Sequence, residues 1–133
     1  MNNRFRKWEK PKFDSKGLTK WNWMCQHHDK LKLGKYVDIG AFTYINAKYG
    51  IVIEDNVQIG SNCSIYSHST IDEKKGKIII KENARIGSHS TIMPGIKIGK
   101  NSLIGAHSFV NINIPDNSIA YGVPVKIVRM KKE

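Results

Sequence analysis

Three histidines, His68, His89 and His107, recur at near-regular intervals in the second half of the 133-residue chain. His107 stands eighteen positions after His89, and His89 stands twenty-one positions after His68. An imidazole can act as a general base at neutral pH, and several imidazoles held together can bind zinc. Which of these chemistries is available depends on the elements that hold the three side chains.

Those elements follow a six-residue period between Leu33 and Val110. A period of six fits neither an α-helix, whose apolar residues recur every 3.6 positions, nor an ordinary strand, which alternates every two. We interpret it as a structural repeat. Thirteen aliphatic residues begin the hexads: Leu33, Ile39, Ile45, Ile53, Ile59, Ile65, Ile71, Ile80, Ile86, Ile92, Ile98, Ile104 and Val110.

The interior of each hexad indicates a short strand followed by a corner. The fifth position is mostly small or apolar, and the fourth often carries Asn, which tolerates the left-handed backbone of a sharp corner. Such units bury their apolar face only by stacking, so we predict an all-β fold, a parallel β-helix. We expect a cap over residues 1–32, the repeats over 33–114, and a C-terminal turn with a basic tail over 115–133.

The closing repeats resemble a known family. The segments 86–99 (IGSHSTIMPGIKIG), 104–110 (IGAHSFV), 114–115 (IP) and 121–126 (YGVPVK) are similar to the last coils of maltose, galactoside and related sugar acetyltransferases. The resemblance to these hexapeptide-repeat acyltransferases spans about residues 33–129. It implies a left-handed β-helix with three hexads per coil, a homotrimer with active sites in the subunit clefts, and acetyl-CoA as the acyl donor.

With three hexads per coil, side chains eighteen positions apart lie on the same edge of the solenoid. Two extra residues interrupt the repeat near Tyr49 and Gly50, and we count three extra residues between Ile71 and Ile80, in a loop within 72–77. Removal of those three places His68, His89 and His107 on one edge. The alternative is that a corner His is present for its backbone, because His is enriched at positive φ.

His68 is the candidate catalytic base, with His89 as the second candidate. His68 precedes the loop, about where the sugar-acetylating relatives place their base. Acyl transfer to a hydroxyl or amino group requires removal of a proton as the nucleophile attacks, and imidazole suits that task. The resemblance implies a sugar or sugar nucleotide as the acceptor, and Asn46 is the nearest candidate, by position, for orienting it.

The resemblance also assigns cofactor contacts. Ser88 and Ala106 match positions whose backbone contacts the pantetheine arm, and they too are one eighteen-residue coil apart. Lys126 and Arg129 match basic positions near the phosphoadenosine end. A lysine that often follows the last coil in the family is replaced here by Asn111-Ile112, so one phosphate contact is missing.

A metal site is the competing interpretation of three aligned histidines. The γ-class carbonic anhydrases share the fold and bind zinc through three histidines, two of them in a His-x-x-x-x-His motif. In this chain the residue five positions after His89 is Pro94. Side chains on adjacent coils are also too parallel for easy tetrahedral ligation. We therefore expect no metal.

The charge and composition constrain the partners. The formal net charge is +11, and residues 1–35 hold ten Lys and Arg against three acidic residues. Because this arm carries no RNA-binding signature, we interpret it as a cap and do not expect nucleic acid. Without a membrane-spanning apolar run or a signal peptide, we expect a cytoplasmic protein and no membrane partner. A non-catalytic β-helix interaction protein and a polyanion or nucleic-acid binder acting through the arm remain the alternative functions.

Overall fold

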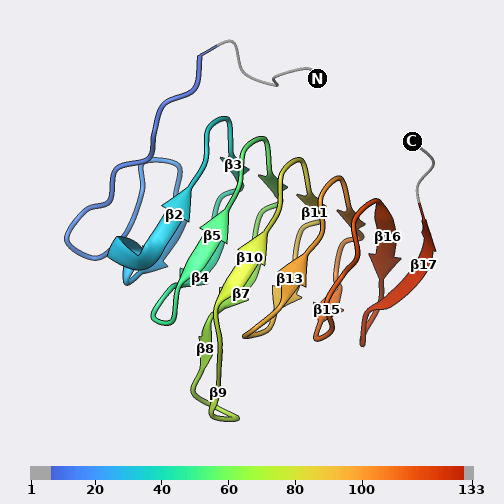
Figure 1. The fold of residues 1–133 in the computed structure, drawn as a ribbon. Helices are drawn as coiled ribbons and strands as arrows, with labels where there is room; N and C mark the ends of the chain where they lie inside the picture. Colours follow the sequence, from blue (N-terminus) through green and yellow to red (C-terminus); the bar gives the residue numbers. More distant parts are fainter. Residues whose placement is uncertain (1–6, 131–133) are drawn as a thin grey trace.

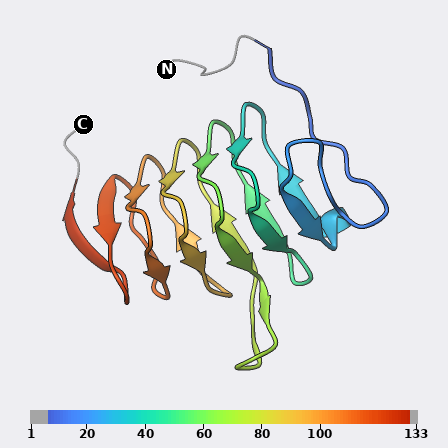
Figure 2. The ribbon, with the colours of Figure 1, turned by 180° about the vertical axis from the view of Figure 1, so that it is seen from behind.

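The computed structural model describes residues 7–130, which form a parallel β-helix of about five coils. Residues 1–6 of the predicted cap and 131–133 of the predicted tail lie outside the described residues. Short strands stack along one axis and connect through tight corners (Figures 1 and 2). The left-handed, all-β fold that the resemblance implies is therefore confirmed.

Three parallel sheets form the sides of the solenoid. Sheet A contains β1 (Met24–Gln26), β4 (Tyr44–Asn46), β7 (Ser64–Tyr66), β12 (Thr91–Ile92) and β15 (Phe109–Val110). Sheet B contains β2 (Leu31–Leu33), β5 (Ile51–Ile53), β10 (Ile78–Ile80) and β13 (Lys97–Ile98). Sheet C contains β3 (Asp38–Ile39), β6 (Gln58–Ile59), β11 (Arg85–Ile86), β14 (Leu103–Ile104), β16 (Ser118–Tyr121) and the antiparallel β17 (Lys126–Met130).

The chain runs from sheet B to C to A in every coil, so the solenoid has three edges. We call them the B–C edge, which includes Asn56, the C–A edge, which includes His89, and the A–B edge, which includes Gly50. A hairpin of β8 (His68–Ser69) and β9 (Lys74–Lys75) projects from the A–B edge (Figure 1).

The aliphatic heads of the hexads fill the narrow core, as the period predicts. Every one of the thirteen except Ile71 is buried or packs against the core. The fifth positions within the solenoid also face inward, and the hydroxyls of several of them donate to carbonyls of the next coil. Thr43 Oγ1 donates to Gly60 O at 2.8 Å, and Ser102 Oγ donates to Pro115 O at 2.7 Å. Polar groups inside the solenoid are thus paired, as burial requires.

Ile71 is a correction to the sequence-based prediction. Its side chain is 98% exposed because it lies in the turn of the β8–β9 hairpin. Ile65 pairs in register with Ile92, and Ile92 pairs in register with Val110. Along the chain, the step from Ile65 to Ile92 is nine positions longer than the step from Ile92 to Val110. The chain therefore leaves the solenoid for nine residues here, three times the length that the sequence predicts. Ile71 falls one hexad after Ile65 without being the head of a repeat.

The corners adopt the left-handed backbone that the Asn pattern predicts. Asn56, Asn83 and Asn101 on the B–C edge have φ values of 61°, 63° and 60°. Side chains on this edge also form a ladder, in which Asn83 Nδ2 donates to Asn101 Oδ1 at 2.8 Å and Asn101 Nδ2 donates to Asn117 Oδ1 at 3.2 Å. A left-handed corner costs other L-residues about 1–2 kcal/mol, so the repeated Asn stabilises this edge.

The N-terminal segment closes one end of the solenoid. Trp23 is 2% exposed and meets the ring of Phe13 edge-on at a centroid distance of 5.5 Å. Trp8 Nε1 donates a hydrogen bond to Val37 O at 2.9 Å. The segment also supplies β1 and the 3₁₀ helix η1 (His28–Lys30), and β1 pairs in register with β4, so the first coil begins at Met24. Among residues 7–130 we find no helix with the length and hydrophobicity needed to span a membrane.

Candidate active site

The C–A edge brings together four of the residues singled out in the sequence: Ser88, His89, Ala106 and His107. His107 N donates to Ser88 O at 2.9 Å, which places the two corners on adjacent coils. The imidazoles of His89 and His107 stack with centroids 4.8 Å apart and an interplanar angle of 14°. This part of the predicted histidine alignment is confirmed.

Glycines allow the coils to approach closely beneath this edge. A Cβ built on Gly87 would lie 2.5 Å from Ala106 N, and one on Gly60 would lie 2.7 Å from Ser88 N. Real Cβ atoms essentially never come so close to backbone, so only Gly fits. Ser88 and Ala106, which follow Gly87 and Gly105 on this edge, carry only small side chains.

Lys126 lies at the C-terminal end of the same edge. It pairs in register with Tyr121, whose Cβ is 2.8 Å from a Cβ built on Gly105, the residue before Ala106. Arg129 pairs with Ile119, farther from the edge on sheet C. Both cations are exposed. Ser88, Ala106 and Lys126 thus follow one line parallel to the solenoid axis, with Arg129 to one side.

His68 lies on a different edge, which corrects the prediction that all three histidines align. The nine-residue excursion begins after β7, the third strand of sheet A. His68 therefore extends from the A–B edge into the hairpin, opposite Lys75 in β9. His89 has a φ of 61° and His107 a φ of 58°, whereas His68 is not among the positive-φ residues. The backbone explanation therefore accounts for His89 and His107, and it does not account for His68.

The half-buried His68 ring contacts Tyr49, which belongs to the two-residue insertion of the preceding coil. The two rings meet edge to face at a centroid distance of 5.2 Å and an angle of 85°. The ammonium groups of Lys48 and Lys75 lie 5.7 Å and 5.6 Å from the centroid of the Tyr49 ring. The base candidate is therefore supported on one side by an aromatic ring and lies near cationic side chains.

Asn46 is also at this edge and is linked to His68 through Ser67. Ser67 N and Ser67 Oγ donate to the carbonyl of Asn46 at 2.9 Å and 2.7 Å. Tyr49 N donates to Ser67 Oγ at 3.0 Å. The buried Ser67 thus fixes the start of the hairpin against the previous coil. Asn46 and His68 are brought to one edge, as a role on a common acceptor requires.

Tyr49, Lys48 and Lys75 are residues that the sequence does not assign to a site. The insertion at Tyr49 is visible as a break in the period. Because Ile45 pairs in register with Ile65, Tyr49 and His68 lie on the same edge whatever the length of the loop that follows. The loop length decides instead whether His89 and His107 share that edge.

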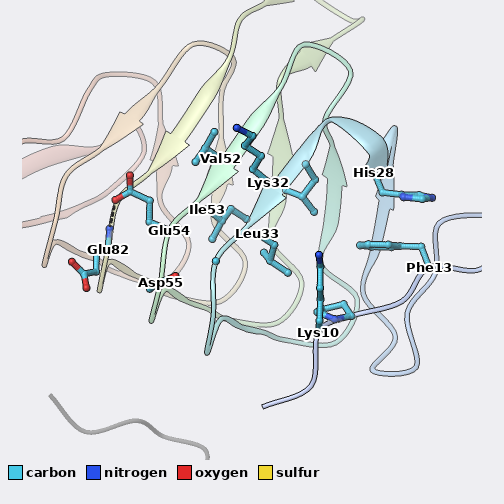
Figure 3. Close-up of a pocket in the computed structure, with 13 residues that line it drawn as sticks. Lys10, Phe13, His28, Lys32, Leu33, Val52, Ile53, Glu54, Asp55 and Glu82 are labelled. Carbon is cyan, nitrogen blue, oxygen red and sulfur yellow. Dashed lines mark hydrogen bonds between the residues drawn. The ribbon is translucent and has the colours of Figure 1, made fainter. Parts of the chain in front are cut away.

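A cavity of about 800 Å³ lies elsewhere, between the N-terminal segment and sheet B. Figure 3 shows the stacked rings of Phe13 and His28 on one side and the carboxylates of Glu54 and Glu82 on the other. It includes none of the site residues that the sequence predicts. Across residues 7–130, no three His, Cys, Asp or Glu side chains converge as a metal site would require.

Comparison with known proteins agrees with the observed fold. The family model described as bacterial transferase hexapeptide (six repeats) matches residues 77–111, and a model of the hexapeptide repeat of succinyl-transferase matches residues 50–70. A galactoside O-acetyltransferase of Lactococcus lactis subsp. lactis is 34% identical over 111 residues, which are 72% of this chain and 54% of the relative. The chain thus spans about half the length of that relative.

Two solved structures share the fold. One is a hexapeptide-repeat acetyltransferase from Vibrio cholerae complexed with acetyl coenzyme A, with 26% identity and a TM-score of 0.77, covering 84% of this chain and 66% of that one. The other is a maltose O-acetyltransferase from Clostridium difficile, with 29% identity and a TM-score of 0.74, covering 84% and 65%. The repeat period, the stacked coils and these matches together show that the chain belongs to the hexapeptide-repeat acyltransferase family.

Proposed function

We propose that this protein is an acyl-CoA-dependent acyltransferase that acetylates a hydroxyl or amino group of a sugar or sugar nucleotide. The observation that carries the proposal is the placement of His68: it is half-buried at the base of a projecting hairpin, and no left-handed corner explains its presence. The names of the relatives, galactoside and maltose O-acetyltransferase, support the same class of reaction.

The acyl-CoA would lie along the C–A edge. Ser88 and Ala106 offer accessible backbone along the edge, and Lys126 and Arg129 supply cations at its end that suit phosphate groups. The bound donor supplies the acyl group as a thioester. At the other edge, His68 would accept the proton that the acceptor hydroxyl or amine loses as it attacks, and Asn46 would orient the acceptor.

Sheet A separates His68 from Ser88 within one chain, because the two residues lie on different edges. We infer a homotrimer in which the A–B edge of one copy faces the C–A edge of the next. Such a contact joins two different surfaces, and repetition of it closes into a ring when the rotation is threefold. Each of three equivalent clefts then combines His68 of one copy with Ser88 and Ala106 of its neighbour.

The first test is calorimetric titration with acetyl-CoA at low and moderate salt, with free CoA as the comparison. We expect saturable binding near one site per chain, weakened by Lys126→Ala and by raised salt, because exposed charges are screened. Lys100→Ala is the matched control, since Lys100 is an exposed cation on the B–C corner. Absence of binding under both conditions would favour a non-catalytic interaction protein.

The second test separates chemistry from binding. His68→Ala should retain acetyl-CoA binding and lose turnover by about 10²- to 10⁴-fold, the usual contribution of a general base. Release of free CoA thiol in the presence of amino and hydroxy sugars measures turnover. Full turnover by the variant would exclude His68 as the base. Deletion of residues 1–30 tests the alternative polyanion binder, for which steeply salt-dependent binding should disappear.

A further inference from the structure

A second cleft, of about 490 Å³, opens where the A–B edge meets the outer face of sheet B. Four lysines line it, Lys30, Lys32, Lys48 and Lys77, with Asp29 as the one carboxylate among its lining residues and Tyr49 as an aromatic wall. Lys32, labelled in Figure 3, also borders the N-terminal cavity.

The fold gathers these lysines from three separate segments. Lys30 ends η1 and Lys32 lies in the adjoining β2, Lys48 adjoins the two-residue insertion, and Lys77 follows the hairpin. Gly50 also lines the cleft, with a φ of 95° that favours glycine, and the Lys77 side chain passes at an ordinary contact distance of 3.6 Å from the position that a Cβ on Gly50 would occupy. Both irregularities of the repeat therefore contribute a lysine to one place.

The charge in the cleft is unbalanced. Within residues 7–130, none of its four lysines forms an ion pair with a carboxylate. Like charges that face a common low-dielectric wall repel one another, and a concave surface lined by one sign of charge concentrates ions of the opposite sign. Lysine ammonium groups are common ligands for phosphate. The natural occupant is a polyanion with several closely spaced oxygens.

The cleft adjoins the candidate base. Tyr49 lines it, and the same ring meets the His68 imidazole at 5.2 Å. The ammonium groups of Lys48 and Lys75 approach the Tyr49 ring centroid to 5.7 Å and 5.6 Å. An anion held by the lysines would therefore be about one aromatic ring away from the proton acceptor.

We propose that this cleft binds the phosphate or diphosphate of a phosphorylated acceptor, a sugar phosphate or sugar nucleotide, and so places its hydroxyl or amine near His68. The proposal rests on the acyltransferase function argued above. CoA also carries phosphates, but the residues matched to its contacts, Ser88, Ala106 and Lys126, lie on the C–A edge. The experiment must therefore distinguish an acceptor's phosphates from those of the donor.

The test uses inorganic pyrophosphate, titrated into the full chain at low salt. We expect saturable binding that weakens at least about tenfold in the double variant Lys32→Ala/Lys77→Ala, because a tenfold change corresponds to about 1.4 kcal/mol, shared here between two lysines. Lys100→Ala removes the same kind of charge at another edge and should change the affinity less than about twofold. An equal loss in Lys100→Ala would mean diffuse attraction and would overturn the proposal.

The acetyl-CoA arm identifies the source of the phosphate. Affinity for acetyl-CoA should stay within about twofold of the unmodified protein in Lys32→Ala/Lys77→Ala. A loss of acetyl-CoA affinity equal to that for pyrophosphate would assign the cleft to the donor and refute an acceptor site. If acetyl-CoA fails to bind even the unmodified protein while the lysine-dependent pyrophosphate binding persists, the proposed acyltransferase function fails and the polyanion site stands. Circular dichroism of each variant excludes unfolding as the cause of a loss.

Discussion

The hairpin register can be tested with one substitution placed at two positions. Ile65 is fully buried in sheet A, whereas Ile71 is 98% exposed in the hairpin turn. The period of six predicts that both side chains are buried, whereas in the structure only Ile65 is buried. Replacement of each by Ala therefore measures whether the chain leaves the solenoid at His68 or continues for another hexad.

The expected magnitudes differ by several kcal/mol. Ile65→Ala removes three buried carbon groups at about 0.8 kcal/mol each. The coils on both sides are held in register and cannot collapse onto the cavity, so a cavity term adds to the loss. We expect a fall of about 3–4 kcal/mol in the free energy of unfolding. Ile71→Ala removes no buried contact and should change it by less than about 0.5 kcal/mol.

Urea unfolding followed by tryptophan fluorescence, to which the buried Trp23 contributes, gives both values. The protein concentration is held fixed because the proposed trimer would add to the apparent stability. With a slope of about 1.5 kcal/mol per molar urea, Ile65→Ala should lower the midpoint by about 2 M. Similar losses for the two variants would place Ile71 in the core and restore the shorter loop. A negligible loss for Ile65→Ala would refute the burial argument itself.

Three further predictions concern the coil contacts, the histidines and a buried thiol. Gly87→Ala should cost about 3 kcal/mol, because its Cβ would overlap Ala106 N of the next coil and force the backbone apart; thermal unfolding measures it, and an unchanged midpoint would contradict it. His107→Asn should preserve stability within about 0.5 kcal/mol, since Asn also accepts the left-handed corner; a loss above about 1 kcal/mol in urea unfolding would assign stability to the imidazole stack. Burial raises the pKa of Cys25 from 9.0 to about 12. The thiol therefore ionises at lower pH in the unfolded state than in the folded state. The free energy of unfolding should fall between pH 9 and pH 12, and it should fall more in the unmodified protein than in Cys25→Ala; parallel declines would refute this.

The repeat can be predicted because its cause is local. Each hexad carries an aliphatic residue that must be buried and a corner residue that tolerates positive φ, and both properties are visible in the sequence. Residue type alone predicts corners at Asn56, Asn83 and Asn101, and all three have φ near 60°. The line of Ser88 and Ala106 follows from the eighteen-residue coil, because no insertion separates them.

The excursion at His68 cannot be predicted in the same way, because its length depends on long-range pairing. Ile71 stands one hexad after Ile65, so the local sequence is that of one more repeat. Only the partner of Ile65 reveals the difference, and that partner is Ile92 on the next coil. For the same reason the position of Lys75, opposite His68 in the hairpin, cannot be predicted from the period.

The incorrectly predicted loop and the candidate site fall in the same segment for a physical reason. A hexad within the solenoid buries its apolar residues in the core, and its corner His or Asn is explained by backbone conformation alone. The segment from His68 to Lys75 makes no such contribution: its one aliphatic residue is exposed, and its strands pair with each other. Nothing in the packing of the solenoid requires this hairpin, its histidine or its lysines. The solvent-exposed excursion lies beside an aromatic ring and a lysine-lined cleft. Binding or catalysis explains this arrangement, and core packing does not.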